Sequence, residues 1–334
     1  MTHVRFLHEL QRMDKVDFAI LGSGAIGSII GGHLARAGCR VAMLARGGRA
    51  QQIEQDGLRI SGLAQFSQAV SVVTDPTTLR AADVLIMATK TQDSALALAP
   101  LRGVSIGTAF SIQNGIMKNE LLADCFGGEK ILGALADTSG ELLPSGEITF
   151  SRNANVYIGE LDGSNSARAM EIAAIIDASG VRATSVTDIQ RLEWSKFASW
   201  VGMMVLSATT RTSTWKYLVD PGSALVLVRL VREIGLLAAA RGIELSDRSV
   251  LPVATVCLNS EQEAVAVIQR AGNQLKSTSP NHRMSTLQDL EAGRALEVEE
   301  TLGWGVRIAK QHNLLLPLLN SFYPLVAGID RVRR

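Results

Sequence analysis

The feature that most constrains the fold is a glycine-rich turn near the start of the chain, Gly22-Ser-Gly-Ala-Ile-Gly27. It follows an apolar run over 16–21 that predicts a buried strand, and it precedes an apolar helical pattern that Gly38 ends. Glycines at these positions allow a tight turn and let backbone N–H groups at a helix N-terminus approach a pyrophosphate. A purely structural glycine turn is the alternative. The predicted dinucleotide-binding residues are Gly22, Ser23, Gly24, Ala25, Ile26 and Gly27.

Further apolar runs in the first half of the chain predict more strands of the same sheet. They lie at 40–45, 83–89 and 104–112. Because parallel strands need crossover connections, the sheet should have helices on both faces. Over 130–159 the pattern changes to short strands separated by Gly, Pro and Asn turns, which indicates an antiparallel extension.

After one more helix and strand, the second half of the chain has a helical period throughout. Helices are expected at 189–208, 224–241, 260–275, 297–311 and 316–326. We therefore predict an α/β fold class: an N-terminal Rossmann-type, doubly wound parallel sheet over 14–187 and a C-terminal all-helical domain over 188–330. The length of 334 residues also favours two domains.

Composition excludes several classes of function. Hydrophobic residues make up 47% of the chain and charged residues 19%, which favours globular domains over disorder. The net charge of +1 gives no field that would attract DNA or RNA, so we expect no nucleic acid partner.

The location of the protein is predicted from its cysteines and its apolar segments. The three cysteines are far apart and form no CxxC pair, which argues against disulfides and zinc and favours the reducing cytoplasm. The most apolar C-terminal stretch, 224–233, is interrupted by charges well short of a membrane span of about 20 residues. The first residues lack the apolar core of a signal peptide, and Met13 is a second candidate start. The sequence does not fix the oligomeric state, and a homodimer is compatible with it.

An arginine follows the second predicted strand. Arg46 lies 19 residues beyond Gly27, close to where enzymes that use NAD carry an acidic residue for the ribose hydroxyls. A guanidinium at this position can bind a 2′-phosphate, and Arg49 is near enough in sequence to assist. The cofactor prediction is therefore NADP (NADPH). The alternative is a solvated arginine in a turn.

Several short motifs, taken together and in order, resemble the ketopantoate reductases (2-dehydropantoate 2-reductases) over nearly the full length. Besides the glycine turn and Arg46, the matching motifs are Ala88-Thr-Lys90, Ile112-Gln-Asn-Gly115, Glu193-Trp-Ser-Lys196, Ser285-Thr-Leu-Gln-Asp289 and Glu297-Val-Glu. The resemblance implies an NADPH-dependent oxidoreductase that reduces 2-dehydropantoate in pantothenate biosynthesis. It also implies that Lys90 and Asn114 line the cofactor site, with Asn114 reaching the substrate as well.

The resemblance assigns catalytic roles to two residues, Lys196 and Glu297. In this family, the lysine that matches Lys196 lies at the substrate carbonyl, and the glutamate that matches Glu297 contacts the site from another helix. The chemistry requires such a lysine, because hydride addition to a 2-oxo acid builds negative charge on the oxygen, which an ammonium can stabilise and protonate. Without the resemblance, a single helix lysine would be interpreted as a solvated charge.

The sequence departs from the family at the expected substrate site. The family has asparagines four and eight residues after the lysine, where this chain has Trp200 and Met204. Of the family's small hydroxyl residues before Gln-Asp, only Ser285 is kept. We assign Trp200, Met204 and Ser285 to substrate binding, although the first two could equally be packing residues.

Three functions are therefore open at this point. The first is reduction of 2-dehydropantoate itself, and the second is reduction of a more apolar 2-oxo acid or imine, which Trp200 and Met204 would suit. The third is a sensor that binds NADP without turnover. Retention of both Lys196 and Glu297 argues against the sensor, because a binder needs no proton donor.

Overall fold

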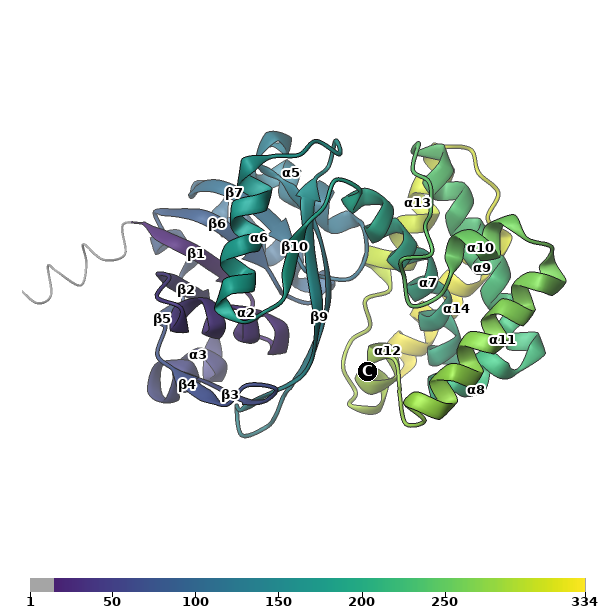
Figure 1. Cartoon of the computed structure of the whole chain (residues 1–334), viewed down its shortest axis with the longest axis horizontal. Coiled ribbons are helices and arrows are strands. Elements are labelled where there is room, and N and C mark those ends of the chain that lie inside the picture. Colours follow the sequence, from purple (N-terminus) through teal and green to yellow (C-terminus); the bar gives the residue numbers. More distant parts are fainter. Residues whose placement is uncertain (1–14, 334) are drawn as a thin grey trace, which may run out of the picture. The chain divides into compact units, whose positions relative to one another are not determined.

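The computed structural model describes residues 15–333, and their contacts divide the chain into two compact units (Figure 1). The first unit comprises the described residues up to Asn114 together with Lys118–Ile189. The second comprises Gly115–Met117 and the described residues from Gln190 onward. Met13, the candidate second start, and residue 14, where the first domain was expected to begin, lie outside the described residues.

The first unit contains a five-stranded parallel sheet, and the sequence predicted four of its strands but not the short one at Ser71–Val73. Its strands are β1 (Val16–Leu21), β2 (Val41–Leu44), β5 (Ser71–Val73), β6 (Ala81–Met87) and β7 (Ser105–Ser111). All neighbouring strands are parallel, and their order is β5-β2-β1-β6-β7. The sheet has an apolar cluster on each face, which explains why its central strands appear in the sequence as continuous apolar runs.

Helices and short 3₁₀ turns connect these strands. The helices are α2 (Ala25–Arg36), α3 (Gly47–Asp56), α4 (Ser94–Leu98) and α5 (Met117–Phe126). The 3₁₀ turns are Pro76–Thr78, Thr91–Asp93, Ala99–Leu101 and Gly128–Lys130. The sequence did not predict α3, which is largely polar and buries only Ala50 and Ile53.

The antiparallel pairing expected over 130–159 is confirmed, but it belongs to a second sheet. Strands β8 (Leu132–Leu142) and β9 (Ile148–Glu160) form a long hairpin. On the other side of β9 lie β10 (Ala183–Ser185) and β3 (Leu58–Gly62), and β4 (Phe66–Gln68) pairs with β3. Helix α2 packs between the two sheets and beside α6 (Ala167–Ser179).

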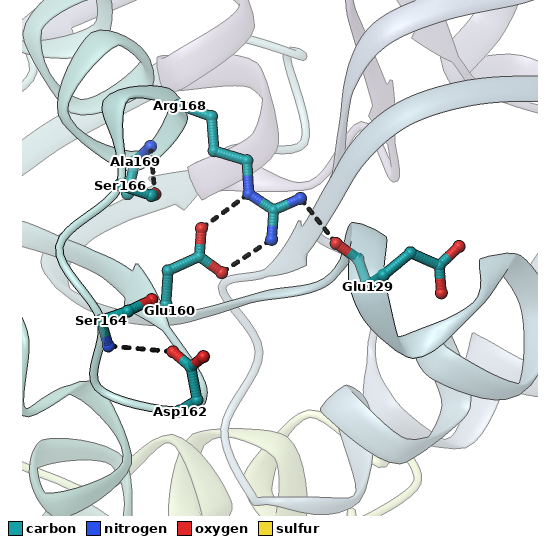
Figure 2. Close-up of polar contacts among 7 residues, drawn as sticks. All are labelled: Glu129, Glu160, Asp162, Ser164, Ser166, Arg168 and Ala169. Carbon is teal, nitrogen blue, oxygen red and sulfur yellow. Dashed lines mark hydrogen bonds and ion pairs between the residues drawn. The ribbon is translucent and has the colours of Figure 1, made fainter.

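A bidentate ion pair attaches the start of α6 to the end of β9 (Figure 2). The guanidinium of Arg168 donates to both carboxylate oxygens of Glu160, each at 2.7 Å, and to the carbonyl of Glu129 at 2.7 Å. Ser166 caps the helix by accepting the N–H of Ala169. Three separate segments of the first unit therefore meet at one guanidinium.

The second unit is all-helical, as predicted. Its helices are α7 (Ile189–Thr210), α8 (Thr214–Val219), α9 (Pro221–Ala240), α10 (Val253–Leu258), α11 (Glu261–Thr278), α12 (Ser285–Glu291), α13 (Trp304–Gln311) and α14 (Pro317–Arg333). Helix α7 is largely buried in one apolar core. Ser260 and Glu263 form a capping box at α11, and Glu233 of α9 accepts the N–H groups of Leu318 and Leu319 at the start of α14. In the part of the chain that the structure describes, no helix is long and apolar enough to cross a membrane.

Two helices of this unit differ in detail from the predicted ones. The element expected at 297–311 begins with a π-helical turn at Glu299–Gly303, and only the part from Trp304 onward is α-helical. The last helix, expected to end at 326, continues to Arg333 with Pro324 inside it.

Candidate functional site

The glycine turn joins β1 to the N-terminus of α2, and two of its three glycines lie against backbone atoms. Gly22 has φ +112°, and a Cβ there would lie 2.6 Å from the amide nitrogen of Thr89. A Cβ on Gly27 would lie 2.2 Å from the carbonyl oxygen of Gly22. Gly24 is exposed, caps α2 without a side-chain bond, and has no atom within 4 Å of its Cβ position. The outer two glycines are therefore required by packing, and the middle one leaves an open surface at a helix N-terminus.

Arg46 lies at the end of β2 and is the N-cap residue of α3. Its side chain is 77% exposed, and its guanidinium lies 3.7 Å from the carboxylate of Asp93. An exposed pair at this distance is weak, so the guanidinium can exchange this partner for a phosphate. The α3 N-terminus beside it adds a further positive field.

The motifs around Lys90 and Asn114 follow two neighbouring strands, β6 and β7, and a buried amide joins them. Gln113 donates from Nε2 to the Thr89 carbonyl at 2.7 Å and to the Ser94 hydroxyl at 2.7 Å. Lys90 is exposed and Asn114 is half-buried. Together with the close approach of Gly22 to Thr89, these bonds place the glycine turn, the Lys90 loop and the Asn114 turn at one edge of the parallel sheet.

Lys118 supports the Asn114 turn, a role that was not predicted from the sequence. It is buried, with 4% exposure, and its ammonium donates to the carbonyls of Ser111 at 2.9 Å, Gln113 at 3.1 Å and Ala134. Its local sequence does not indicate these three carbonyls, which lie at the end of β7, just after β7 and in β8. Gln113 lies within the Ile112–Gly115 motif, but the sequence assigned no role to its side chain.

In the second unit, Lys196, Trp200 and Met204 lie four residues apart along α7 and so share one helix face. Lys196 is half-buried. Trp200 and Met204 are 6% and 0% exposed and belong to the apolar core of this unit. Their packing role is therefore observed, and contact with a substrate stays a prediction.

The segment that carries Glu297 packs against the same helix. The hydroxyl of Thr301 donates to the carbonyl of Glu297 and lies 3.8 Å from the sulfur of Met204. Glu297 is 8% exposed. Burial raises the pKa of the half-buried Glu300 carboxyl, and the charges of its glutamate neighbours add to this effect. The structure thus brings the Glu297 segment onto the helix of Lys196, through a π-helical turn of the kind that is frequent at functional sites.

Ser285 and two serines of α7, Ser199 and Ser207, have different surroundings. Ser285 begins α12 and is half-buried. Ser199 bonds to the Lys196 carbonyl and to the hydroxyl of Ser249, each at 2.9 Å. Within residues 15–333, the hydroxyl of Ser207 is buried without a hydrogen-bond partner. Over the same range, no group of three or more His, Cys, Asp and Glu side chains could hold a metal ion.

Two family models match this chain. Residues 18–163 match the model described as ketopantoate reductase PanE/ApbA, and residues 188–330 match that of its C-terminal part. A 2-dehydropantoate 2-reductase of Archaeoglobus fulgidus is 27% identical over 311 residues, which cover 93% of this chain and 97% of the relative.

Solved structures share the fold. A crystal structure of a PanE/ApbA family ketopantoate reductase from Ralstonia eutropha superposes with a TM-score of 0.80 at 25% identity, covering 96% of this chain and 99% of that one. A ternary complex of D-mandelate dehydrogenase with NADH and anilino(oxo)acetate has a TM-score of 0.79 at 20% identity, with 96% and 99% covered.

Proposed function

The chain belongs to the ketopantoate reductase family, and we propose that it reduces 2-dehydropantoate to pantoate with NADPH. Membership makes it an oxidoreductase that acts on a CH–OH group and uses a nicotinamide dinucleotide. The choice of substrate and of NADPH is the proposal. The observation that carries it is the half-buried Lys196 on α7, whose helix face packs at Met204 against the segment of Glu297.

The preference for NADPH rests on Arg46. Its exposed guanidinium at the start of α3 is suited to a 2′-phosphate, and its weak pair with Asp93 is no obstacle. The open surface at Gly24 fits the pyrophosphate of the same cofactor. When bound, the dinucleotide supplies the hydride.

Lys196 provides the charge and the proton in this proposal. Its ammonium would lie at the carbonyl oxygen of the 2-oxo acid, stabilise the negative charge that develops there, and donate a proton from Nζ to give the hydroxyl group. The buried Glu297 would orient this ammonium or hold the ribose next to the nicotinamide. Asn114 would bind cofactor and substrate from the end of β7, and Lys90 would bind the cofactor from the loop after β6.

The test follows NADPH oxidation with ketopantoate and a panel of other 2-oxo acids. Lys196→Ala should lower kcat by about 10²–10⁴-fold, the usual effect of losing a general acid, and leave NADPH binding nearly unchanged. Lys196→Arg is the matched control, because a guanidinium keeps the charge but does not release its proton near neutral pH. If Lys196→Arg turned over like the unmodified protein, proton donation by Lys196 would be excluded. A protein that bound NADPH and reduced none of the acids would instead support the sensor.

A more apolar 2-oxo acid is the second candidate substrate, and Trp200 and Met204 favour it. D-mandelate dehydrogenase shares the fold at 20% identity, so this fold also serves an aromatic 2-hydroxy acid. A substrate hydroxyl left unpaired against an indole and a thioether would lose about 1–3 kcal/mol.

The two candidates are separated by comparing kcat/KM for ketopantoate and for 2-oxo-3,3-dimethylbutanoate, which lacks the hydroxyl. The comparison is made in the unmodified protein and in Trp200→Asn/Met204→Asn. Preference for the analogue in the unmodified protein, reversed in the double variant, would support the apolar substrate. A strong preference for ketopantoate in the unmodified protein would leave Trp200 and Met204 as packing residues.

A further inference from the structure

Arg49 of α3 is turned inward, onto the glycine turn. Its Nε donates to the carbonyl of Ser23 at 3.1 Å, and its Nη2 donates to the hydroxyl of Ser28 at 3.1 Å. The Ser28 hydroxyl donates in turn to the same Ser23 carbonyl at 3.1 Å. The Arg49 guanidinium, the Ser28 hydroxyl and the Ser23 carbonyl therefore form a closed ring of hydrogen bonds. Ser23 is the residue between the first two glycines of the motif.

The other side of this guanidinium holds the tip of the β8–β9 hairpin. Nη1 donates to the Gly146 carbonyl and to the side-chain oxygen of Gln52, each at 3.0 Å. Gln52 and Arg59 both donate to the carbonyl of Ser145 in the same turn. Gly146 has φ +79°, and a Cβ there would lie 1.7 Å from the Gln52 side chain, so the turn is packed directly on α3.

These contacts distinguish Arg49 from Arg46. Four of the five N–H groups of Arg49 are used by protein acceptors, whereas the Arg46 side chain is 77% exposed. Burial, together with the positive charge of Arg59, lowers the pKa of Arg49, which nevertheless stays charged at neutral pH. The expectation that Arg49 assists in binding the 2′-phosphate is thus not supported by its orientation.

We propose that Arg49 is a positioning residue for the dinucleotide-binding turn. By joining the Ser23 carbonyl to the Gly146 carbonyl, it fixes the turn in the shape that receives the pyrophosphate, and so it acts on NADPH and NADH equally. The hairpin of the second sheet thereby becomes part of the support of the cofactor site. The inference rests on the proposed cofactor role of the glycine turn.

The test measures the Kd of NADPH and of NADH by fluorescence titration of the full chain. Arg49→Gln should raise both Kd values by about tenfold, the equivalent of one charge-assisted hydrogen bond, and leave the ratio of the two Kd values unchanged. Arg46→Ala should instead raise the Kd of NADPH more than that of NADH, because only NADPH carries the 2′-phosphate. Arg59→Gln is the matched control, since it loses a bond to the same hairpin turn without touching the glycine turn, and both affinities should stay within about twofold.

Two further measurements test the proposal without relying on Arg49→Gln alone or on enzymatic turnover: cofactor affinities of a Ser28 variant, and amide hydrogen exchange without cofactor. Ser28→Ala should also weaken both cofactors, and Arg49→Gln/Ser28→Ala should lose less than the product of the single effects, because the two groups share the Ser23 carbonyl. In the apo protein, Arg49→Gln should raise amide hydrogen exchange over residues 22–28 and 143–147.

The results that overturn the proposal are distinct. Selective weakening of NADPH by Arg49→Gln would make Arg49 a 2′-phosphate ligand, and unchanged affinity for both cofactors would remove its positioning role. If Arg49→Gln does not fold, unchanged affinities in Ser28→Ala give the same negative answer. Failure of the unmodified protein to bind either dinucleotide would refute the proposed cofactor site itself, and with it this inference.

Discussion

Replacing Arg168 by Met should destabilise the first unit, because it leaves the carboxylate of Glu160 buried without its main partner. The Glu160 side chain is only 11% exposed and that of Arg168 is 34% exposed. Exposed ion pairs contribute about 0.2–1 kcal/mol, whereas removing one partner of a buried pair costs about 3–5 kcal/mol. This pair lies between the two cases, so we expect a loss of about 2 kcal/mol in the free energy of unfolding at pH 7.5.

The loss should depend on pH in a defined direction. The bidentate bond from Arg168 is the main cause that lowers the pKa of Glu160 below its ordinary value of 4.5, and burial opposes it. The pair therefore contributes its full stability above about pH 4.5, and that contribution is lost as the pH falls through the lowered pKa. Without Arg168, burial raises the pKa of Glu160, so the carboxyl takes up a proton at a higher pH. The difference between Arg168→Met and the unmodified protein should be full at pH 7.5 and should shrink toward pH 4.

The assay is denaturant unfolding followed by far-ultraviolet circular dichroism, combined with amide hydrogen exchange over β9 and α6. Tryptophan fluorescence is unsuitable, because all four tryptophans lie in the second unit. Arg168→Met/Glu160→Gln is the matched control and should recover part of the loss, since it removes the unpaired charge. A deficit of the same size at pH 7.5 and pH 4, or a double variant less stable than Arg168→Met, would refute the electrostatic explanation.

Three further predictions concern other buried polar groups. Burial lowers the pKa of His33 in the folded protein, so below about pH 6.5 the unfolded chain binds a proton that the folded protein does not, and the free energy of unfolding falls. His33→Leu should therefore reduce the difference in Tm between pH 7.5 and pH 5.5. Lys118→Met leaves carbonyls of the Asn114 turn without a donor, so it should cost about 2 kcal/mol of stability and speed amide exchange over residues 111–114. Ser207→Ala removes a buried hydroxyl that has no partner among the described residues, so Tm should not fall, and an unexpected drop in kcat/KM for ketopantoate would make Ser207 a substrate ligand.

The sequence predicted the parallel sheet well because its strands are buried on both faces. A fully buried strand appears as an apolar run whatever its partners are, and β1 and the second half of β6 have this form, whereas the short and partly exposed β5 was missed. The second sheet was only partly predictable, because the pairing of β9 with β3 joins segments about 90 residues apart and leaves no local pattern. Helix α3 was missed because its few buried residues are too sparse for a helical period.

The candidate site divides in the same way. The position of the glycine turn between β1 and α2 could be predicted, because glycine spacing after a buried strand reports backbone geometry directly, and its dinucleotide-binding role stays a proposal. Gln113, Lys118 and Arg49 could not, because each owes its role to acceptors that only the folded chain brings near it. The π-helical turn after Glu297 was likewise not predicted, since its side-chain pattern is compatible with an ordinary helix.

The helix of Lys196 shows why the substrate is harder to infer than the cofactor. A cofactor site built on strand ends and a helix N-terminus needs backbone groups and a few charges, and these follow from the topology of the sheet. In the proposed function, substrate choice depends instead on the side chains of one helix face, where Trp200 and Met204 are already buried in the core. A core residue and a pocket wall have the same composition and the same burial until a ligand is present. The kinetic comparison of two acids that differ by one hydroxyl measures what burial cannot distinguish, because an unpaired hydroxyl costs free energy only when the substrate is bound against that face.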